Sequence, residues 1–291
     1  MIKKFFVLFL SLSLLFFAAE ACLAEDTSAE RVYVRGEIRE SIDMTEDQLS
    51  EIMNESIQNS LDLKLYDLPV HPVLVPPADK NFRLQIKFFG SLTEMLMALN
   101  AGLIDGACVP EFTGKYLLAR NDDLRAGMFE FSNVKESFYM GFYQNTELRD
   151  RVNEALAAMK ADGTLYVLEK TYLKDFSTEP APAVFETFEG AETITVAVTG
   201  DLPPVDYIAA DGTPAGFNTA LLSEIGKRLK INIELINIES SARTVSLTSG
   251  VADVIFWYLY GENYVITDME NGIQLSDPYY DLDNWFYIEK K

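Results

Sequence analysis

The stretch FRLQIKFFGSLTEMLMALNAGLIDGACV, residues 82–109, carries the clearest pattern of secondary structure in the chain. Apolar and polar residues alternate over Phe82–Phe89, which is the pattern of a half-buried strand. Residues 91–102 run from a Ser-x-x-Glu capping box through an apolar stripe at helical spacing to an Asn-Ala-Gly stop. A second short strand follows at residues 104–109. This spacing is that of a βαβ unit, so the sequence predicts an α/β fold with a mainly parallel sheet.

The chain on either side of this unit continues the alternation of strands and helices. Thr45-x-x-Gln48 is another capping box, and it predicts a helix that extends to about Asn59. Residues 66–80 hold four prolines and are expected to form a loop or an extended arm. The other elements expected before residue 174 are strands at 32–36 and 137–143 and helices at 147–160 and 165–173.

A linker separates this part of the chain from a second run of elements. Residues 174–192 contain Pro, Glu and small residues without any period, which is a linker composition. The pattern then restarts with a strand at 194–198, a turn-rich loop at 199–212 and a helix at 219–229 that Asn218 can cap. The remaining expected elements are strands at 231–238, 251–257 and 284–288 and a short helix at 241–249.

The N-terminus has the three-part layout of a secretory signal. Two lysines precede an apolar run over residues 5–17, and small residues come after it. The run is shorter than the ~20 apolar residues that a membrane span needs. We therefore expect residues 1–24 to be a signal peptide and the protein to be periplasmic or extracellular. Cleavage after Ala21 instead would place Cys22 at the start of the mature chain, where it can carry a lipid anchor.

The composition argues against several classes of catalytic site. The chain has two cysteines, so loss of Cys22 with the signal leaves Cys108 without a disulfide partner. The single histidine, His71, lies next to prolines in an extended segment, which disfavours a Ser-His-Asp triad or a histidine-rich metal site. We find no phosphate loop, no Gly-rich dinucleotide turn and no metal-spaced Cys/His cluster, and we expect neither a cofactor nor a metal.

The charge of the chain argues against nucleic-acid binding. The formal net charge is -21, and removal of residues 1–24 makes it -22 because two lysines and one glutamate leave. A surface this acidic repels nucleic acid and anionic membranes. The charge keeps an exported protein soluble, but it does not identify a ligand.

Several motifs after the linker resemble those of a known family. The stretches Thr195-Val-Ala-Val-Thr-Gly-Asp-Leu-Pro-Pro-Val-Asp-Tyr207 and Asp211-Gly-Thr-Pro-Ala-Gly-Phe-Asn218 resemble the opening of bacterial extracellular solute-binding proteins of family 3, the periplasmic amino-acid-binding type. The stretches 221–229, 246–255 and Ser276-Asp277-Pro278-Tyr279-Tyr280 resemble later helices and strands of the same half of that family. The resemblance implies a two-lobed type II periplasmic-binding fold, in which each lobe is a mixed, mainly parallel sheet flanked by helices.

The part of the chain before the linker resembles the rest of the family, so the two halves stand in swapped order. Ser91–Val109 resembles the helix and strand of the second lobe, and Glu147–Tyr172 resembles the family's C-terminal helices. Two explanations remain open, namely a circular permutation and a decayed tandem repeat. The expected division is a signal peptide at 1–24, lobe two at 31–136, a return to lobe one at 137–173, a linker at 174–192 and lobe one at 193–291.

The resemblance places a solute between the lobes, at the C-terminal ends of parallel strands, but the usual ligand anchors are missing. Leu202 stands where the family has an aromatic cover, Val265 where it has a carboxylate-binding arginine, and Pro110 where it has an ammonium-binding aspartate. The residues expected to bind the ligand are Trp257, Tyr258, Tyr260, Glu111, Arg243, Asp201 and Leu202.

Each of these residues has a functional and a structural interpretation. The three aromatic residues suit stacking on a ring or on a cation, but they also suit core packing. Glu111 can balance a cationic group or lie in solvent, and Arg243 can replace the missing arginine or be a surface charge. Asp201 sits in a loop where aspartate also stabilises turns through local hydrogen bonds.

Three functions are compatible with these expectations. The first is a monomeric solute-binding protein that takes up a small polar or aromatic/cationic, amino-acid-like solute and delivers it to the membrane permease of an ABC transporter. The second is a degenerate family member that acts as an interaction module without a small-molecule ligand. The third is an enzyme of the cyclohexadienyl-dehydratase type, for which Glu111 is the only candidate acid or base. We expect a binding protein rather than an enzyme.

Overall fold

The structure is a computed structural model that describes residues 31–38, 45–51, 54, 82–126, 130–176, 180–261 and 272–291. The expected signal peptide, the Pro-rich segment 66–80 with His71, and Val265 lie outside the described residues. The capping box at Thr45 is confirmed, because its amide donates to Gln48 Oε1 (2.9 Å) and the Gln48 amide donates to Thr45 Oγ1 (3.2 Å). The helix after this box is described over residues 46–51 and 54, so its predicted end at Asn59 is not seen.

The described strands form one large sheet and one small one. The large sheet contains β1 (Arg31–Ile38), β2 (Phe82–Phe89), β3 (Gly106–Pro110), β4 (Leu124–Ala126), β5 (Glu130–Tyr143), β6 (Thr193–Val198), β10 (Asn232–Asn237), β11 (Val254–Gly261), β12 (Ile273–Leu275) and β13 (Tyr280–Lys290). Their order is β10-β6-β11-β5-β13-β3-β1-β2, with β12 also paired to β5 and β4 also paired to β13. A small sheet consists of β7 (Asp201–Leu202), β8 (Asp206–Ile208) and β9 (Pro214–Ala215). β7 and β8 lie in the loop that was expected at 199–212, and β9 follows it.

The large sheet consists of two halves with the same strand order. Half I contains β2, β1 and β3, which run parallel, then the antiparallel β13 and the short β4. Half II contains β10, β6 and β11, which run parallel, then the antiparallel β5 and the short β12. In both halves the first strand in the chain is central, with the second strand on one side of it and the third on the other.

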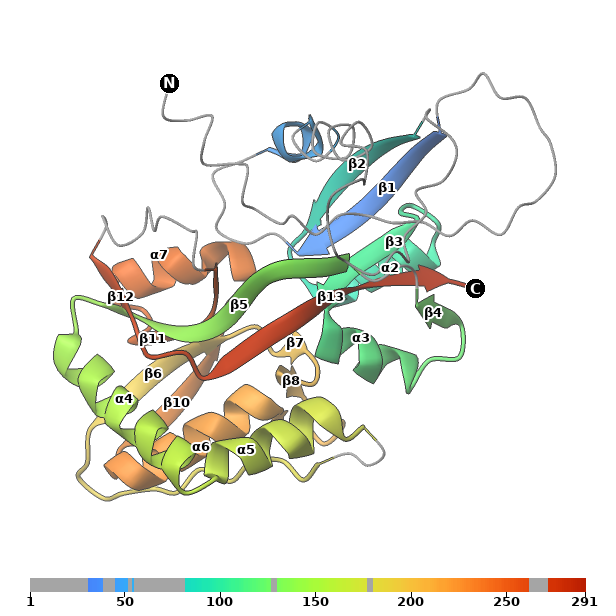
Figure 1. Ribbon diagram of the computed structural model, residues 1–291. Coiled ribbons are helices and arrows are strands. Elements are labelled where there is room, and N and C mark those ends of the chain that lie inside the picture. The colour runs from blue at the N-terminus through green and yellow to red at the C-terminus, as the bar shows by residue number, and fades with distance from the viewer. Residues whose placement is uncertain are drawn as a thin grey trace.

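Two long strands connect the halves. β5 carries the chain from half I into half II, and β13 carries it back. They pair with each other, with Phe138 opposite Tyr280 and Ser137 opposite Asp281, and the Ser137 hydroxyl donates to Asp281 (2.6 Å). Figure 1 shows β5 and β13 running side by side across the middle of the molecule. The pair therefore joins both halves into a single sheet.

Helices cover each half. They are α2 (Leu92–Asn100), α3 (Glu111–Leu118), α4 (Thr146–Ala161), α5 (Thr164–Glu169), α6 (Phe217–Leu229) and α7 (Arg243–Thr248), with a π-helical turn at Lys170–Lys174 and a 3-10 turn at Ser240–Ala242. α2 and α3 pack on half I, whereas α4, α6 and α7 pack on half II. In Figure 1, α4, α5 and α6 lie together on one side of the crossing strands, and β1 and β2 lie on the other.

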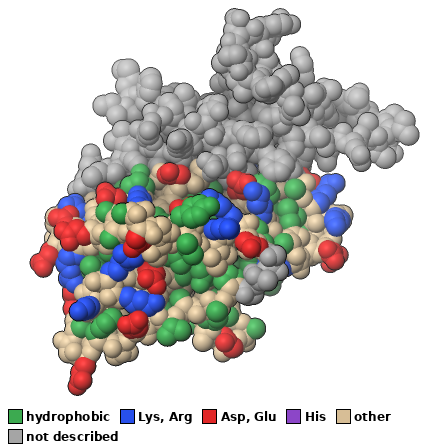
Figure 2. Space-filling view, turned by 60° about the horizontal axis from the view of Figure 1, so that its bottom comes forward, with side chains coloured by type: hydrophobic (Ala, Val, Ile, Leu, Met, Phe, Trp, Pro, Cys, Tyr) green, Lys and Arg blue, Asp and Glu red, His purple; other side chains and the backbone are tan. Residues whose placement is uncertain are grey.

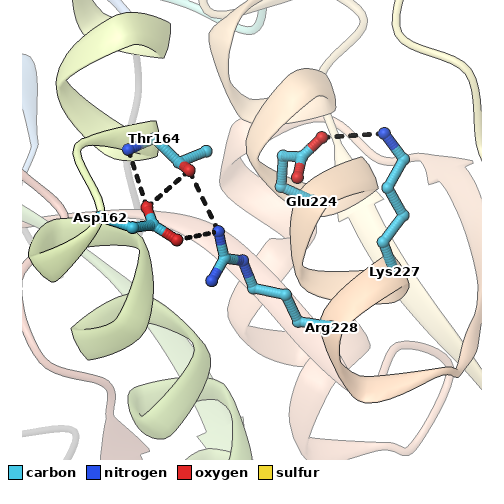
Figure 3. Close-up of polar contacts among 5 residues, drawn as sticks. All are labelled: Asp162, Thr164, Glu224, Lys227 and Arg228. Atoms are coloured by element: carbon cyan, nitrogen blue, oxygen red, sulfur yellow. Dashed lines mark hydrogen bonds and ion pairs between the residues drawn. The ribbon is translucent and has the colours of Figure 1, made fainter.

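A polar cluster fastens the helices before the linker to the helix after it (Figure 3). Arg228 on α6 donates to Asp162 Oδ2 (2.7 Å) and to Thr164 Oγ1 (3.0 Å). Asp162 Oδ1 accepts from the amide and the hydroxyl of Thr164. The hydrogen bonds from Thr164, together with Arg228, lower the pKa of Asp162 to about 2. Glu224 and Lys227 form a separate ion pair of 2.8 Å on the same helix.

The segment expected to be a linker is held against half II. The Ser223 hydroxyl donates to the Val184 carbonyl (2.7 Å), and Asn232 exchanges two hydrogen bonds with the backbone of Phe188. No regular element is assigned over the described residues 180–188. A linker composition is typical of such irregular backbone, but it gives no sign of these tethers.

The surface carries both signs of charge. On the face shown in Figure 2, acidic and basic side chains are interspersed, with apolar side chains between them. Among the described residues, this face shows no single-sign stripe of the kind that tracks a nucleic-acid backbone. Among the described helices, none is both long and apolar enough to cross a membrane.

The expected α/β class with helices flanking the sheet is confirmed, while two local expectations are wrong. Asn218 is not a helix cap, because α6 begins at Phe217 after Gly216. β11 continues to Gly261 instead of ending at Trp257, because antiparallel pairing with β5 extends it. α3 was not expected from the sequence, since its first residue follows Pro110 and its interior holds Gly114.

Candidate functional site

The segments after the parallel strands of the two halves meet at one place. Asp201 comes after β6 of half II and contacts Thr93, which comes after β2 of half I. Phe112 comes after β3 and contacts Tyr280 at the start of β13. Tyr116 on α3 lies 6.1 Å, between ring centroids, from Tyr207 on β8. The carboxyl ends of parallel strands are where α/β sheets place ligands, so we take this junction as the candidate site.

The inner part of the junction is a cluster of aromatic rings. Phe112 packs against Phe138 and Tyr280 with ring centroids 5.8 Å and 5.6 Å away, and Phe217 packs against Tyr279 and Tyr280 at 6.1 Å and 6.0 Å. These rings come from both halves and from both crossing strands. The gap between them has no room for a water molecule. In this conformation the aromatic cluster seals the inner part of the junction.

The outer part of the junction is open. A cavity of about 470 Å³ lies between the C-terminal end of β2 and the 3-10 turn at Ser240–Ala242. Its described lining consists of Thr45, Glu46, Asp47, Phe88, Phe89, Gly90 and Ser241. Glu46 accepts a hydrogen bond from the Phe88 amide (2.7 Å). The described wall therefore combines two carboxylates with two aromatic rings, and such a wall favours a cationic or aromatic group.

A buried polar network lies behind the aromatic cluster. The Asp206 carboxylate is 1% exposed and accepts hydrogen bonds from the amides of Thr199 and Gly200, both at 2.9 Å. Burial raises the pKa of Asp206 above its ordinary value, although the Arg243 charge and these hydrogen bonds act in the opposite direction. Burial also raises the pKa of Tyr279. The network fixes the loop after β6. Asp206 thus stabilises this turn through local hydrogen bonds, which is the structural role that aspartate often has in such loops.

Arg243, a predicted ligand-binding residue, lies inside half II. Its side chain is 3% exposed, and it donates to the Phe256 carbonyl (3.1 Å) and to the Ser240 hydroxyl (3.3 Å). The guanidinium thus joins the start of α7 to β11. The structure places it in contact with protein atoms of one half, so its expected role at a ligand stays a prediction.

Asp201 and Leu202 form the short strand β7 but point to different surroundings. Leu202 is 1% exposed and belongs to the main hydrophobic core. Asp201 is partly exposed, and its Oδ2 accepts the Thr93 amide of the opposite half at 3.2 Å. Of the two, only Asp201 reaches across the junction through a hydrogen bond.

Glu111 is the first residue of α3 and forms an ion pair with Lys115 one turn later. Its side chain is 23% exposed. The described residues contain no group of three or more His, Cys, Asp or Glu side chains that could hold a metal ion. Glu111 directly precedes Phe112 of the aromatic cluster, and its carboxylate is paired with the Lys115 ammonium group.

Trp257, Tyr258 and Tyr260 all lie in β11, and their side chains fall outside the described residues. The backbone register sets Tyr258 opposite Tyr139 and Tyr260 opposite Ser137. Trp257 occupies the irregularity between Phe256 and Tyr258. An extra residue in a strand re-aims the neighbouring side chains, so the alternation of this segment cannot be extrapolated from the sequence.

Sequence reasoning missed the residues that close the junction, namely Phe112, Phe138, Tyr279, Tyr280 and Thr93. Tyr279 and Tyr280 belong to a motif that was quoted for its family resemblance, but not as part of a site. The sequence does contain a signal for this cluster, because Phe138 and Tyr280 are aromatic residues that face each other in the pair of crossing strands. Recognising that signal requires knowing that these strands pair with each other.

Comparisons with known proteins bear on part of the chain. Residues 194–290 match the family of bacterial extracellular solute-binding proteins, family 3, so the resemblance inferred from the motifs after the linker is confirmed over these residues. The resemblance of residues 91–109 and 147–172 lies outside the match and stays a prediction. A search of curated proteins finds no match.

Several solved structures are similar to the chain at low identity. The ligand-binding component of an ABC-type import system from Staphylococcus aureus is 13% identical, with 89% of this chain and 66% of that chain covered and a TM-score of 0.44. The alkanesulfonate-binding protein SsuA from Xanthomonas axonopodis pv. citri is 11% identical, with 91% and 67% covered and a TM-score of 0.43. The BvgS VFT2 domain from Bordetella pertussis is 11% identical, with 89% and 80% covered and a TM-score of 0.42. This chain thus spans about two thirds of the length of the first two.

Proposed function

We propose that the chain is an exported solute-binding protein that takes up a small solute between its two halves and delivers it to the permease of an ABC transporter. The observation that carries the proposal is the match of residues 194–290 to solute-binding proteins of family 3. The repeated strand order of half I and half II supports two equivalent lobes, lobe two and lobe one, around one junction. Export by a signal peptide at 1–24 and a monomeric state belong to the same proposal.

The order of the halves supports a circular permutation. All of half I except β13 precedes the strands β6, β10 and β11 of half II, while the part that matches the family model lies at residues 194–290. α4 and α5 precede the linker, yet they pack against α6 after it, and Arg228 contacts Asp162 there. We infer that residues 174–192 join an ancestral C-terminus to an ancestral N-terminus, because permutation succeeds where the two termini lie close together.

The chemistry of the junction favours a cationic or aromatic solute. Glu46 and Asp47 line the outer cavity together with Phe88 and Phe89. Arg243 contacts protein atoms inside half II, which argues against its serving as a carboxylate anchor. A desolvated cation gains from carboxylates and from aromatic faces together. We therefore propose an amine or an aromatic, amino-acid-like compound rather than an anion.

A thermal-shift screen of the mature chain tests the proposal. The compounds are amines, amino acids, nucleobases and short peptides, with anionic sulfonates as the contrasting class. A ligand present at about 100 times its Kd adds about 2.7 kcal/mol to the free energy of unfolding and raises Tm. We expect a shift with at least one amine or aromatic compound. Shifts with sulfonates alone would contradict the proposed solute class, and no shift with any class would contradict solute binding itself.

One observation favours a second function, that of an interaction module without a small ligand. The aromatic cluster of Phe112, Phe138, Phe217, Tyr279 and Tyr280 fills the inner junction. A solute-binding protein needs this space for its ligand, or its two halves must move apart to create it. We propose no catalytic role for Glu111, because Lys115 already pairs with its carboxylate.

A further inference from the structure

The first turn of α2 has an incomplete set of acceptors within its own half. Ser91 accepts the Glu94 amide (3.2 Å), and Glu94 in turn accepts the Gly90 amide (3.1 Å). The Thr93 amide, between these two, donates to Asp201 Oδ2 (3.2 Å). The first amides of a helix have no partner inside the helix, so an acceptor from outside must satisfy them. Here that acceptor belongs to half II.

The chemistry of this contact is favourable for a carboxylate. The N-terminus of a helix carries a partial positive charge, and an acidic group placed there is stabilised. Asp201 is held in position by β7, which pairs with β8 through Asp201 opposite Tyr207. β8 is in turn fixed by the buried carboxylate of Asp206. The Asp201 side chain is therefore presented to α2 by a rigid part of the opposite half.

Other contacts show that the two halves are closed around this point. Tyr207, the pairing partner of Asp201, faces Tyr116 of half I with ring centroids 6.1 Å apart. The inner aromatic cluster leaves no space for a water molecule. The Asp201–Thr93 hydrogen bond lies at the partly exposed rim of this closed junction. It can therefore break and re-form without disrupting either hydrophobic core.

We propose that Asp201 is a built-in latch, whose carboxylate binds the N-terminus of α2 and holds the two halves closed. The latch follows from the contact between the two halves and does not depend on the proposed function. Opening of the junction then requires release of Asp201 from Thr93.

The latch is tested by replacing its acceptor in the mature chain without any solute. Asp201→Ala removes the carboxylate, and Asp122→Ala is the control, because Asp122 is an exposed aspartate of half I in the turn before β4. Small-angle X-ray scattering measures the radius of gyration, and hydrogen exchange measures opening at the Thr93 amide. Because the variant loses an acceptor at the start of a helix, the Thr93 amide should exchange about fivefold faster in Asp201→Ala.

We expect Asp201→Ala to increase both the radius of gyration and the Thr93 exchange rate, with no change in Asp122→Ala. Circular dichroism and Tm confirm that both variants are folded. A radius of gyration for Asp201→Ala equal to that of the control would overturn the latch. Because no solute is present, a negative thermal-shift screen would contradict the proposed function but would leave this test unaffected.

Discussion

Arg228 of α6 lies 2.7 Å from the carboxylate of Asp162, so it connects the helix after the linker to the helices before it (Figure 3). The same carboxylate accepts the amide and the hydroxyl of Thr164. The cluster therefore links the C-terminal end of α4, the start of α5 and the last turn of α6. This relationship supports the view that residues on opposite sides of the linker form one unit.

Asp162→Asn should lower stability at neutral pH and make no difference in strong acid. The folded state holds the pKa of Asp162 at about 2, below its ordinary value of 3.8. A depressed folded pKa gives stability that is complete above the ordinary pKa and disappears as the pH falls toward 2. Thermal unfolding of both proteins between pH 6 and pH 2 measures this. A Tm difference that stays constant across the range would contradict the assignment.

Gly216→Ala should destabilise the protein by about 3 kcal/mol, since a strained backbone and a steric clash combine. Gly216 has a φ of 111°, and an added Cβ would lie 2.4 Å from the Val205 carbonyl oxygen. Gly212→Ala is the matched control, because its φ is 86° but no atom lies within 4 Å of its added Cβ. Urea unfolding should show a clearly larger loss for Gly216→Ala. Equal losses would mean that the close approach at α6 does not matter.

Phe112→Ala should cost about 3–5 kcal/mol, the range for removal of a buried aromatic ring. Phe112 is 2% exposed and contacts rings from both crossing strands. Tyr166→Ala is the control, because Tyr166 is 63% exposed on α5 and its loss should change stability by no more than about 0.5 kcal/mol. Chemical unfolding of the two variants provides the comparison. If Phe112→Ala were as mild as Tyr166→Ala, the aromatic cluster would not hold the halves together.

Arg243→Met should destabilise the protein at pH 7 by about 3 kcal/mol, because it leaves the Asp206 carboxylate buried without its nearby cation. Burial raises the folded pKa of Asp206, while the Arg243 charge lowers it. Without Arg243 the folded pKa rises further, so the folded state binds a proton more tightly than the unfolded chain does. Stability is then retained at acidic pH and lost as the pH rises through that folded pKa.

Unfolding measured at pH 4 and at pH 7 tests this sign. The loss caused by Arg243→Met should be smaller at pH 4, and the double variant Arg243→Met/Asp206→Asn should lose less than the single variant at pH 7. A loss that is independent of pH, with no rescue in the double variant, would show that the two groups are not coupled.

Much of the fold can be predicted from sequence periodicity. The βαβ unit at 82–109 and the strand and helix at 194–229 are confirmed, because each has a clear period and a clear stop, such as Gly102 with its φ of 70°. The lengths of β5 and β11 could not be predicted, since antiparallel pairing between distant segments extends them. α3 was missed because Pro110 and Gly114 mask its helical pattern.

The candidate site was less accessible to sequence reasoning. Asp201 was named and does reach across the junction, whereas Arg243 was named but turns into half II. A sequence shows which residues come after a strand, but the direction of each side chain depends on tertiary packing. The Asp201–Thr93 contact joins residues 108 positions apart, and no local pattern predicts such a pairing.

Binding of a solute between the two halves is best tested by hydrogen-exchange footprinting with the strongest compound from the thermal-shift screen. If a solute binds between the halves, it should protect residues 88–90 of half I and Ser241 of half II together, because both border the outer cavity. Protection confined to one half, or placed away from this junction, would contradict the account.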